Sequence, residues 1–244
     1  MPTALAISPH LDDAAFSAGG TLAWLAQQGW DVVVVTVFTA TVPSPAGFAL
    51  RCQTDKGLPT EADYMAIRRA EDEAAGAVLG ARVLHLPLRE APHRGYQSPA
   101  ALFGPLRADD RPEPVAAALR LQLADYRPAL ILAPQALGGH VDHVLTVQAL
   151  LSLSLSPPVL WWQDFPYLRR ADTPRRPFSD FWNSLPECAP PTDPARKHRA
   201  CAAYATQLGY QFDGPEGLAR ALAETGGAEQ MRLQGQSPLP ELAE

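Results

Sequence analysis

Short apolar runs alternate with longer amphipathic segments along most of the chain. The apolar runs predict strands at residues 4–8, 31–38, 82–86, 129–133 and 158–162. The second of these runs contains four successive valines, which is typical of a strand that is buried on both faces of a parallel sheet. The segments between and after the runs predict helices at residues 13–28, 61–79, 115–125, 143–153 and 195–208.

The predicted helices are based on the spacing of apolar residues and on glycines that mark helix ends. Phe16, Leu22 and Leu25 can share one buried helical face, and Gly29 and Gly80 follow two of the predicted helices, where glycine favours a helix end. Alternation of strand and helix predicts an α/β fold. We expect a single Rossmann-like domain over residues 1–244, with a mostly parallel twisted sheet covered by helices on both faces.

Several segments lack this regular pattern. Residues 39–60 and 87–114 are expected to be loops because prolines and glycines interrupt them. Residues 157–194 contain nine prolines and many aromatic residues, and predict a long ordered excursion over one face of the domain. The stretch from about residue 225 to residue 244 is weakly patterned and predicts a weakly ordered tail.

Composition narrows the class of protein. A hydrophobic content of 47% and a charged content of 19% are those of a soluble globular protein. The net charge of −6 disfavours a nucleic-acid partner, and no apolar stretch approaches the ~18 residues of a membrane span. Widely spaced Cys52, Cys188 and Cys201 suggest reduced thiols. We therefore expect a cytoplasmic location without a signal peptide, and a homo-oligomer is left open.

Two turns carry the candidate chemistry. Three of the six histidines lie in them: His10 in His10-Leu11-Asp12-Asp13, and His140 and His143 in His140-Val141-Asp142-His143. Each turn follows a predicted strand, the first and the fourth. In a sheet of strand order 3-2-1-4-5 these two strands are neighbours, and ligands bind at their carboxyl ends, where the order reverses. The topology therefore predicts one composite site.

Imidazole and carboxylate groups suit a catalytic Zn²⁺ that keeps one open position, and Fe²⁺ is an alternative. The turns offer more imidazole and carboxylate groups than three ligand positions need, so some of them must do other work, and an aspartate such as Asp12 could accept a proton from water. Each turn taken alone is more simply explained as a helix N-terminus capped by its carboxylates. The pair of turns at two strand ends favours metal-assisted hydrolysis.

The chain resembles the PIG-L or LmbE-like family of zinc-dependent N-acetylglucosaminyl deacetylases. The resemblance lies in the two turns, in Arg68-Arg69-Ala70-Glu71 with Leu79-Gly80, and in Lys197, Ala202, Tyr204 and Gln207. It implies that His10, Asp13 and His143 hold zinc and that Asp12 is the general base. It also implies that His140 polarises or protonates the reacting group of the substrate during turnover. Asp142 would orient a histidine. Leu11 and Ala14 depart from the proline and glutamate usual in the family turn.

The resemblance further implies that Arg68 contacts the substrate and that Glu90 binds sugar hydroxyls. The alternative for Arg68 is a surface ion pair with Asp72. His93 and Arg94 belong to a candidate substrate loop, whereas His85 and His198 are given no role in catalysis. The aromatic residues from Trp161 to Trp182 could line the cleft and stack on a sugar, or form core under a long loop.

We therefore expect a metal-dependent hydrolase that removes the acetyl group from an N-acetylated amino sugar or its glycoside, with Asp12 as base and a protonated His140 facing the oxyanion. One alternative is a Rossmann-type nucleotide-dependent transferase. Gly19 and Gly20 come too late after the first strand for a dinucleotide fingerprint, which counts against it. The other is a non-catalytic, metal-bearing sugar-binding protein, which would not need Asp12.

Overall fold

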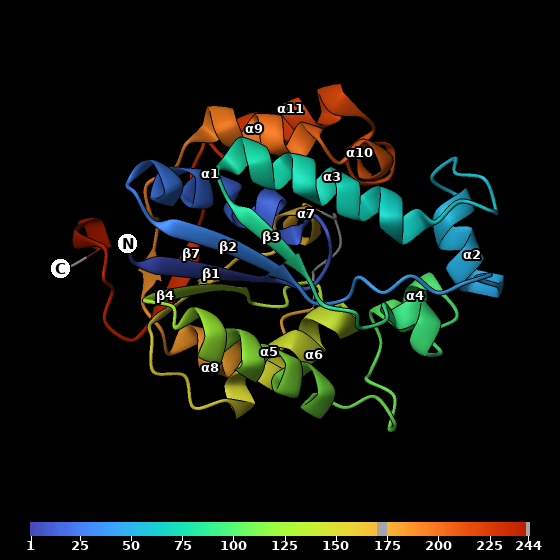
Figure 1. The fold of residues 1–244 in the computed structure, drawn as a ribbon, viewed down its shortest axis with the longest axis horizontal. Helices are drawn as coiled ribbons and strands as arrows, with labels where there is room; N and C mark the ends of the chain where they lie inside the picture. Colours follow the sequence, from blue (N-terminus) through green and yellow to red (C-terminus); the bar gives the residue numbers. More distant parts are fainter. Residues whose placement is uncertain (170–174, 243–244) are drawn as a thin grey trace.

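A sheet runs through the middle of the molecule, and helices cover both of its faces (Figure 1). The structure is a computed structural model that describes residues 1–169 and 175–242. Within these residues the strands are β1 Thr3–Ser8, β2 Asp31–Thr36, β3 Arg82–His85, β4 Leu130–Pro134, β5 Val159–Trp162, β6 Glu187–Cys188 and β7 Met231–Gln234. Their order is β3-β2-β1-β4-β5-β7-β6.

The predicted α/β fold and the strand order 3-2-1-4-5 are confirmed. β1 pairs in parallel with β2 on one side and with β4 on the other, and β3 and β5 extend the parallel part. β7 and β6 add an antiparallel edge. The carboxyl ends of β1 and β4 consequently lie next to each other, on the side where α2 and α4 are found (Figure 1).

Helices form a layer on each face of the sheet (Figure 1). One layer contains α1 Asp13–Gln27, α3 Tyr64–Leu79, α7 Phe165–Leu168, α9 Pro194–Ala202, α10 Ala205–Phe212 and α11 Pro215–Ala223. The other contains α5 Glu113–Tyr126, α6 Val141–Ser152 and α8 Ser179–Asn183. The short helices α2 Gly47–Thr54 and α4 Pro99–Leu102 lie beyond the strand ends, and 3-10 turns occupy Ala91–Arg94 and Pro240–Leu242. Of the helices described, none has the length and apolarity that crossing a membrane requires.

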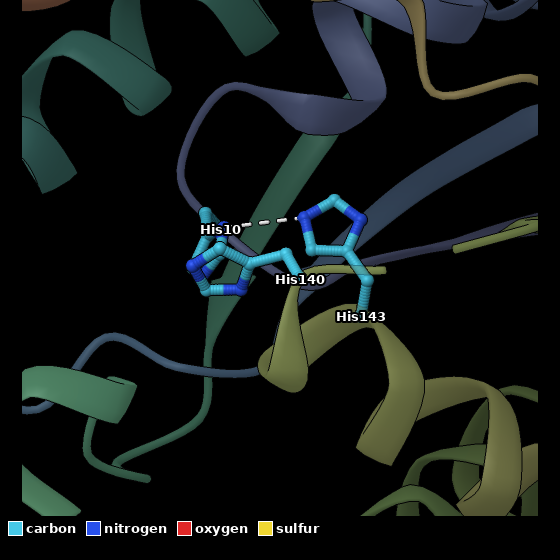
Figure 2. Close-up of side chains that lie close together, drawn as sticks. All are labelled: His10, His140 and His143. Carbon is cyan, nitrogen blue, oxygen red and sulfur yellow. Dashed lines mark hydrogen bonds between the residues drawn. The ribbon is translucent and has the colours of Figure 1, made fainter. Parts of the chain in front are cut away.

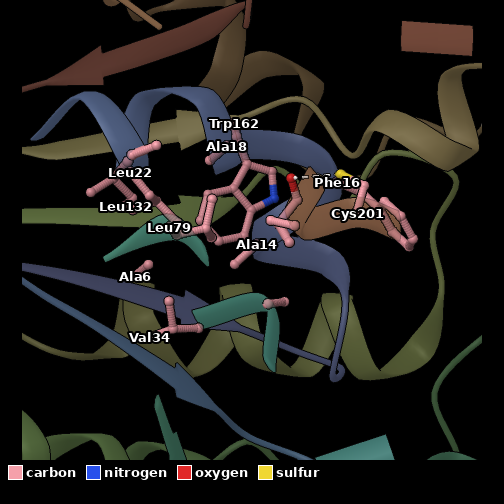
Figure 3. Packing of buried hydrophobic residues seen from close by; sticks show 14 of the residues in the cluster. Ala6, Ala14, Phe16, Ala18, Leu22, Val34, Leu79, Leu132, Trp162 and Cys201 are labelled. Carbon is pink, nitrogen blue, oxygen red and sulfur yellow. Dashed lines mark hydrogen bonds between the residues drawn. The ribbon is translucent and has the colours of Figure 1, made fainter. Parts of the chain in front are cut away.

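Side-chain alternation along β1 divides the core into two clusters. Ala4 and Ala6 face the α1 layer, whereas Leu5 and Ile7 face the α5 and α6 layer. In the first cluster Leu22 of α1 lies with Leu132 and Trp162 of the sheet (Figure 3), whereas Phe16 packs against Tyr204 and Phe212. Because both faces of β1 are packed in the core, the position of its last residue is fixed, and so is the start of the turn that follows.

Several predicted boundaries need correction. The expected helix 61–79 begins only at Tyr64, because the Asp63 side chain caps it by accepting from the Ala66 amide. The expected loop 39–60 contains α2. The expected single helix 195–208 is broken into α9 and α10 around Tyr204, whose hydroxyl donates to buried Asp72 over 2.6 Å. α11 was not anticipated by the sequence pattern.

The prediction of a weakly ordered tail is wrong for the described part of residues 225–242. Glu229 is buried, and its carboxylate accepts from the backbone amides of Gly20 and Thr21 in α1, each over 2.8 Å. The ammonium of Lys197 on α9 lies 2.7 Å from the same carboxylate. These contacts fix the end of the chain to α1 and α9, and β7 follows directly as a sheet strand.

We expect Glu229→Gln to lower the free energy of unfolding by about 3–5 kcal/mol, because it leaves the Lys197 ammonium buried without a counter-charge. Urea denaturation followed by circular dichroism measures the change. Glu187→Gln is the matched control, since Glu187 pairs with Arg232 at the solvent-exposed sheet edge. Equal stability of the two variants would contradict a structural role for the Glu229 pair.

Candidate metal centre and pocket

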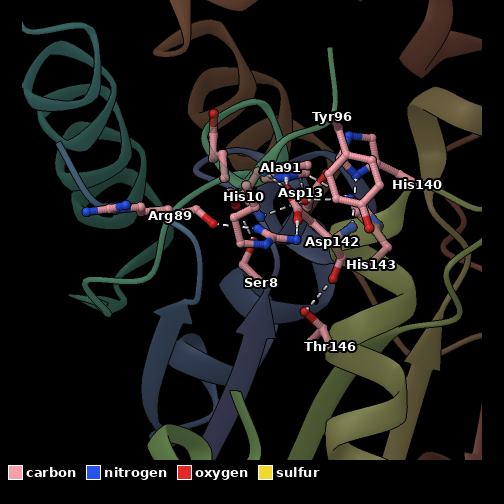
Figure 4. A network of polar contacts seen from close by, with 12 residues as sticks. Ser8, His10, Asp13, Arg89, Ala91, Tyr96, His140, Asp142, His143 and Thr146 are labelled. Carbon is pink, nitrogen blue, oxygen red and sulfur yellow. Dashed lines mark hydrogen bonds and ion pairs between the residues drawn. The ribbon is translucent and has the colours of Figure 1, made fainter. Parts of the chain in front are cut away.

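The two histidine-bearing turns meet at the carboxyl ends of β1 and β4 (Figure 4). In the first turn the Ser8 hydroxyl donates to the His10 carbonyl over 2.6 Å and accepts from the Ala14 amide over 3.0 Å. The second turn contains Gly138 and Gly139, both at positive φ. A Cβ at Gly138 would lie 2.9 Å from the Cβ of Tyr167, so that position requires glycine both for its backbone and for its space.

Three donor atoms from these turns converge. His10 Nδ1 lies 3.2 Å from Asp13 Oδ2, His143 Nε2 lies 3.1 Å from the same oxygen, and the two nitrogens are 3.3 Å apart. A tetrahedral Zn²⁺ with ligands at about 2.0–2.1 Å places its ligand atoms about 3.3 Å from each other. The triangle formed by His10, Asp13 and His143 therefore has the size that such an ion needs.

A second grouping overlaps this triangle. The ligand atoms of His10, His140 and His143 all lie within 4.8 Å of one another, and Figure 2 shows their imidazoles turned toward a common centre. Both groupings share His10 and His143. The cluster can therefore hold a divalent metal ion, and the two groupings differ only in whether Asp13 or His140 completes it.

Each shared histidine has its remaining nitrogen fixed by a buried carboxylate. His10 Nε2 donates to Asp142 over 2.9 Å, and His143 Nδ1 donates to Asp164 over 2.7 Å. When each ring is neutral, these bonds leave its unprotonated nitrogen facing Asp13. Burial lowers the pKa of His143, but the Asp13 and Asp164 carboxylates outweigh burial and raise it to about 9. The centre thus attracts positive charge.

Sequence reasoning missed Asp164. It follows β5, whose carboxyl end lies beside that of β4, so the rule that identified the two turns could also have pointed to it. Besides orienting His143, its carboxylate accepts from the Leu137 amide over 2.8 Å. Asp164 thereby ties the turn after β4 to the segment after β5.

Arg94 lies behind the centre, which corrects its expected place in a substrate loop. Its guanidinium pairs with Asp142 at 2.6 Å and with Asp110 at 2.9 Å, and it is not among the residues that line the pocket. Burial by itself raises the pKa of Asp142, but Arg94 and His10 hold that pKa well below its usual range. Arg94 thus keeps the orienting carboxylate ionised.

His93 also differs from the expectation of a substrate contact. It faces a separate hollow with Thr41 and Asp63 rather than the pocket that contains the metal centre. The 3-10 turn Ala91–Arg94 explains this, because it turns His93 away from Asp142 while the Ala91 amide donates to Asp142 over 3.1 Å.

Asp12, Arg68 and Glu90 form a buried charged row beside the donor triangle. Arg68 is 2.6 Å from Glu90 and 3.5 Å from Asp12, and Gln211 donates to the other oxygen of Asp12 over 3.0 Å. The alternative ion pair of Arg68 with Asp72 is therefore wrong. Burial raises the pKa of Asp12 to about 6, although the Arg68 charge opposes the rise.

His140 is the N-cap of α6, and its Nδ1 accepts from the Asp142 amide over 3.2 Å. An amide can only donate, so a neutral His140 carries its proton on Nε2. Burial and the neighbouring His10 lower the pKa of His140 well below its usual value. The expectation of a protonated His140 is therefore corrected: its contacts favour a neutral ring that still offers one N–H.

These groups form the floor of a cavity of about 250 Å³. Its walls carry the aromatic residues Phe48, Tyr64, Phe103, Tyr167 and Tyr210, which come from or adjoin α2, α3, α4, α7 and α10. Of the predicted aromatic excursion only Tyr167 lines it. Trp161 and Trp162 are fully buried in β5, and Trp182 packs on Trp161, so the core explanation holds for the tryptophans.

Comparison with known proteins agrees with this geometry. The PIG-L family of GlcNAc-PI de-N-acetylases matches residues 5–154. A 2'-N-acetylparomamine deacetylase of Streptomyces fradiae is 32% identical over 172 residues, which are 69% of this chain and 58% of that protein. The chain thus spans less than two thirds of the curated relatives that it matches.

Two solved structures are similar over nearly their whole length. The zinc-inhibited form of a teicoplanin deacetylase has a TM-score of 0.78 and 26% identity, covering 97% of this chain and 100% of that one. The A40926 pseudoaglycone deacetylase has a TM-score of 0.76 and 30% identity, covering 95% and 96%. With the family match extending over more than half of its residues, the chain belongs to the PIG-L family.

Proposed function

We propose that the protein is a zinc-dependent hydrolase that removes the acetyl group from an N-acetylated amino sugar or its glycoside. The observation that carries the proposal is the triangle of donor atoms from His10, Asp13 and His143, 3.1–3.3 Å apart, next to the separate carboxylate of Asp12. In this proposal the first three residues hold the ion and Asp12 is the base.

Bound zinc would supply a lowered pKa for water and a polarised amide carbonyl. Asp12 precedes the ligand Asp13, yet its own carboxylate is turned to Arg68 and Gln211. That carboxylate can accept the proton of the attacking water and later deliver it to the departing amine nitrogen. The charge of Arg68 then stabilises the ionised form to which Asp12 returns.

His140 acts on the other side of the reacting carbonyl. With Nδ1 occupied by the Asp142 amide, its Nε2–H is the one donor that the neutral ring offers. A hydrogen bond from this N–H would strengthen as negative charge develops on the oxygen of the tetrahedral intermediate. The Phe103 ring packs against the imidazole in a T-shaped arrangement, with the ring centroids 5.4 Å apart.

The substrate class follows from the pocket and from the relatives. Arg68 and Glu90 lie on the floor, where one Glu90 oxygen binds Arg68 and the other can accept from a sugar hydroxyl. The aromatic walls suit the apolar faces of a sugar ring. The relatives named above include a 2'-N-acetylparomamine deacetylase and the A40926 pseudoaglycone deacetylase, and the first of these names denotes an N-acetylated substrate.

The two alternatives are less well supported. For a nucleotide-dependent transferase, Gly19 and Gly20 would have to approach a phosphate. Instead they pack against α9 and its preceding segment, where a Cβ at Gly20 would lie 2.9 Å from Thr192. A non-catalytic sugar-binding protein would have no need of a buried carboxylate next to the donor triangle. The cytoplasmic location and a homo-oligomer stay predictions.

The decisive experiment compares acetate release from a panel of N-acetyl glycosides by metal-free protein, by protein reloaded with Zn²⁺ or Fe²⁺, and by the Asp12→Asn variant. We expect activity only with metal, and a loss of about 10²–10⁴-fold in kcat for the variant, as for removal of a general base. The variant should bind as much metal as the unaltered protein. Full activity of Asp12→Asn would remove Asp12 as the base.

The ligand set is tested by a pair of substitutions. Because Asp13 belongs to the donor triangle in our proposal and His140 does not, Asp13→Ala should release the metal on dialysis whereas His140→Ala should retain it and lose kcat. Metal content by plasma emission spectrometry measures the difference, with His143→Ala as the positive control for release. Retention by Asp13→Ala together with release by His140→Ala would favour the three-histidine grouping instead.

Asp164→Asn should weaken metal binding by about 10–100-fold, because an amide no longer holds the His143 tautomer that directs Nε2 to the centre. Competition with a zinc-binding dye measures the dissociation constant. Asp180→Asn on α8 is the control, since Asp180 is exposed. An unchanged constant for Asp164→Asn would contradict an orienting role.

A further inference from the structure

The chain contains only two lysines, Lys56 and Lys197, and their environments differ. Lys197 is buried and pairs with Glu229 at 2.7 Å. Lys56 follows α2 at the wall of the pocket and is half-buried. Among the described residues no carboxylate lies within 4.0 Å of its ammonium. By contrast Arg68, the other lysine or arginine that lines the pocket, is paired with both Asp12 and Glu90.

The Lys56 side chain is nevertheless held in place. Its ammonium donates to the Cys52 carbonyl over 2.9 Å. It also lies 5.2 Å from the centroid of the Tyr64 ring and 5.1 Å from that of Tyr210, distances at which a cation is attracted to an aromatic face. Because the side chain is already ordered, a ligand that binds the ammonium pays little conformational entropy.

The segment that carries Lys56 is anchored as well. The amide of buried Gln53 donates to the carbonyl of Pro59 and, over 3.2 Å, to that of Ala62. These bonds close the loop between α2 and α3. The ammonium is therefore presented from a fixed support at the wall of the pocket.

Lys56 is connected to the floor of the pocket through one aromatic ring. The guanidinium of Arg68 lies 5.5 Å from the centroid of the same Tyr64 ring that Lys56 contacts. Arg68 in turn contacts Asp12 at 3.5 Å. Lys56 and Tyr210, which is 63% exposed, therefore line the same pocket as the floor residues beside the donor triangle.

We propose that Lys56, flanked by Tyr64 and Tyr210, is a subsite for an anionic group, a carboxylate or a phosphate, on the part of the substrate beyond the N-acetyl sugar. This inference rests on the proposed deacetylase function. The ammonium supplies the charge and the two tyrosine rings hold it in position. Lys56 is thus a specificity-determining residue rather than one that takes part in bond cleavage.

The test uses four phenyl β-glycosides of N-acetylglucosamine: unsubstituted, or with a para-carboxylate, a para-phosphate or a para-aminomethyl group. Acetate release gives kcat/KM for the zinc-loaded protein, and calorimetry with the Asp12→Asn variant gives binding without turnover. We expect the acidic probes to exceed the unsubstituted one by about tenfold in both measurements, as for one charge-assisted contact. The aminomethyl probe should be the poorest.

For each variant we compare the kcat/KM of an acidic probe with that of the unsubstituted probe. In Lys56→Met this ratio should fall to about one, whereas Lys56→Arg should keep most of the preference for the acidic probe. Arg51→Met is the matched control, because Arg51 is a cation on α2 that stacks on Phe48 without lining the pocket; its ratio should match that of the unaltered protein. The preference should also shrink as the salt concentration rises. Comparison of the two acidic probes tells carboxylate from phosphate.

The proposed subsite would be contradicted if the unaltered protein showed no preference for the acidic probes. It would also be contradicted if Lys56→Met kept that preference. These outcomes are separate from failure of the proposed function. If no probe loses its acetyl group, the hydrolase assignment fails, while the calorimetric ratio still decides whether Lys56 recognises an anion.

Discussion

The parallel pairing of β1 with β4 is the constraint on which the site depends. The register places Ala6 opposite Leu132, so the two strands end at the same edge of the sheet. His10 and His143, 133 positions apart in the chain, are thereby brought to 3.3 Å between ring nitrogens. Burial of both faces of β1 prevents the strand from slipping, because a shift of one residue would exchange its two core faces.

Charge balance is the second constraint. Four aspartates, Asp12, Asp13, Asp142 and Asp164, are almost fully buried within this small region, and buried carboxylates are costly unless they are paired. Arg68 compensates Asp12 and Arg94 compensates Asp142. Among the described residues, the ion-pair partners of Asp13 and Asp164 are histidines. A divalent cation held between those histidines would add positive charge beside both carboxylates.

The parts of the molecule that the sequence predicted are those fixed by local pattern. The valine run of β2 and each of the two His/Asp turns is a pattern of only a few consecutive residues, and the strand order then follows from general topology. The parts that it missed depend on distant partners. β7 is short and forms because Glu229 is held by α1 and Lys197, and the break before α10 exists because Tyr204 reaches Asp72 on α3. No window of residues around either position contains that information.

The floor and the walls of the pocket also differ in this way: the floor is fixed by the regular fold, whereas the walls depend on individual contacts. The floor residues follow β1, β3 and β4 or lie on α3, so the sheet and its long helix fix their positions. Apart from Tyr64 on α3, the aromatic wall residues come from or adjoin α2, α4, α7 and α10. These are short helices outside the regular strand–helix alternation, held by individual contacts such as that of Gln53 with the α2–α3 loop. Changes in these helices can therefore alter the walls of the pocket without moving the donor triangle. In a fold built in this way the lining of the pocket can vary while its floor is kept.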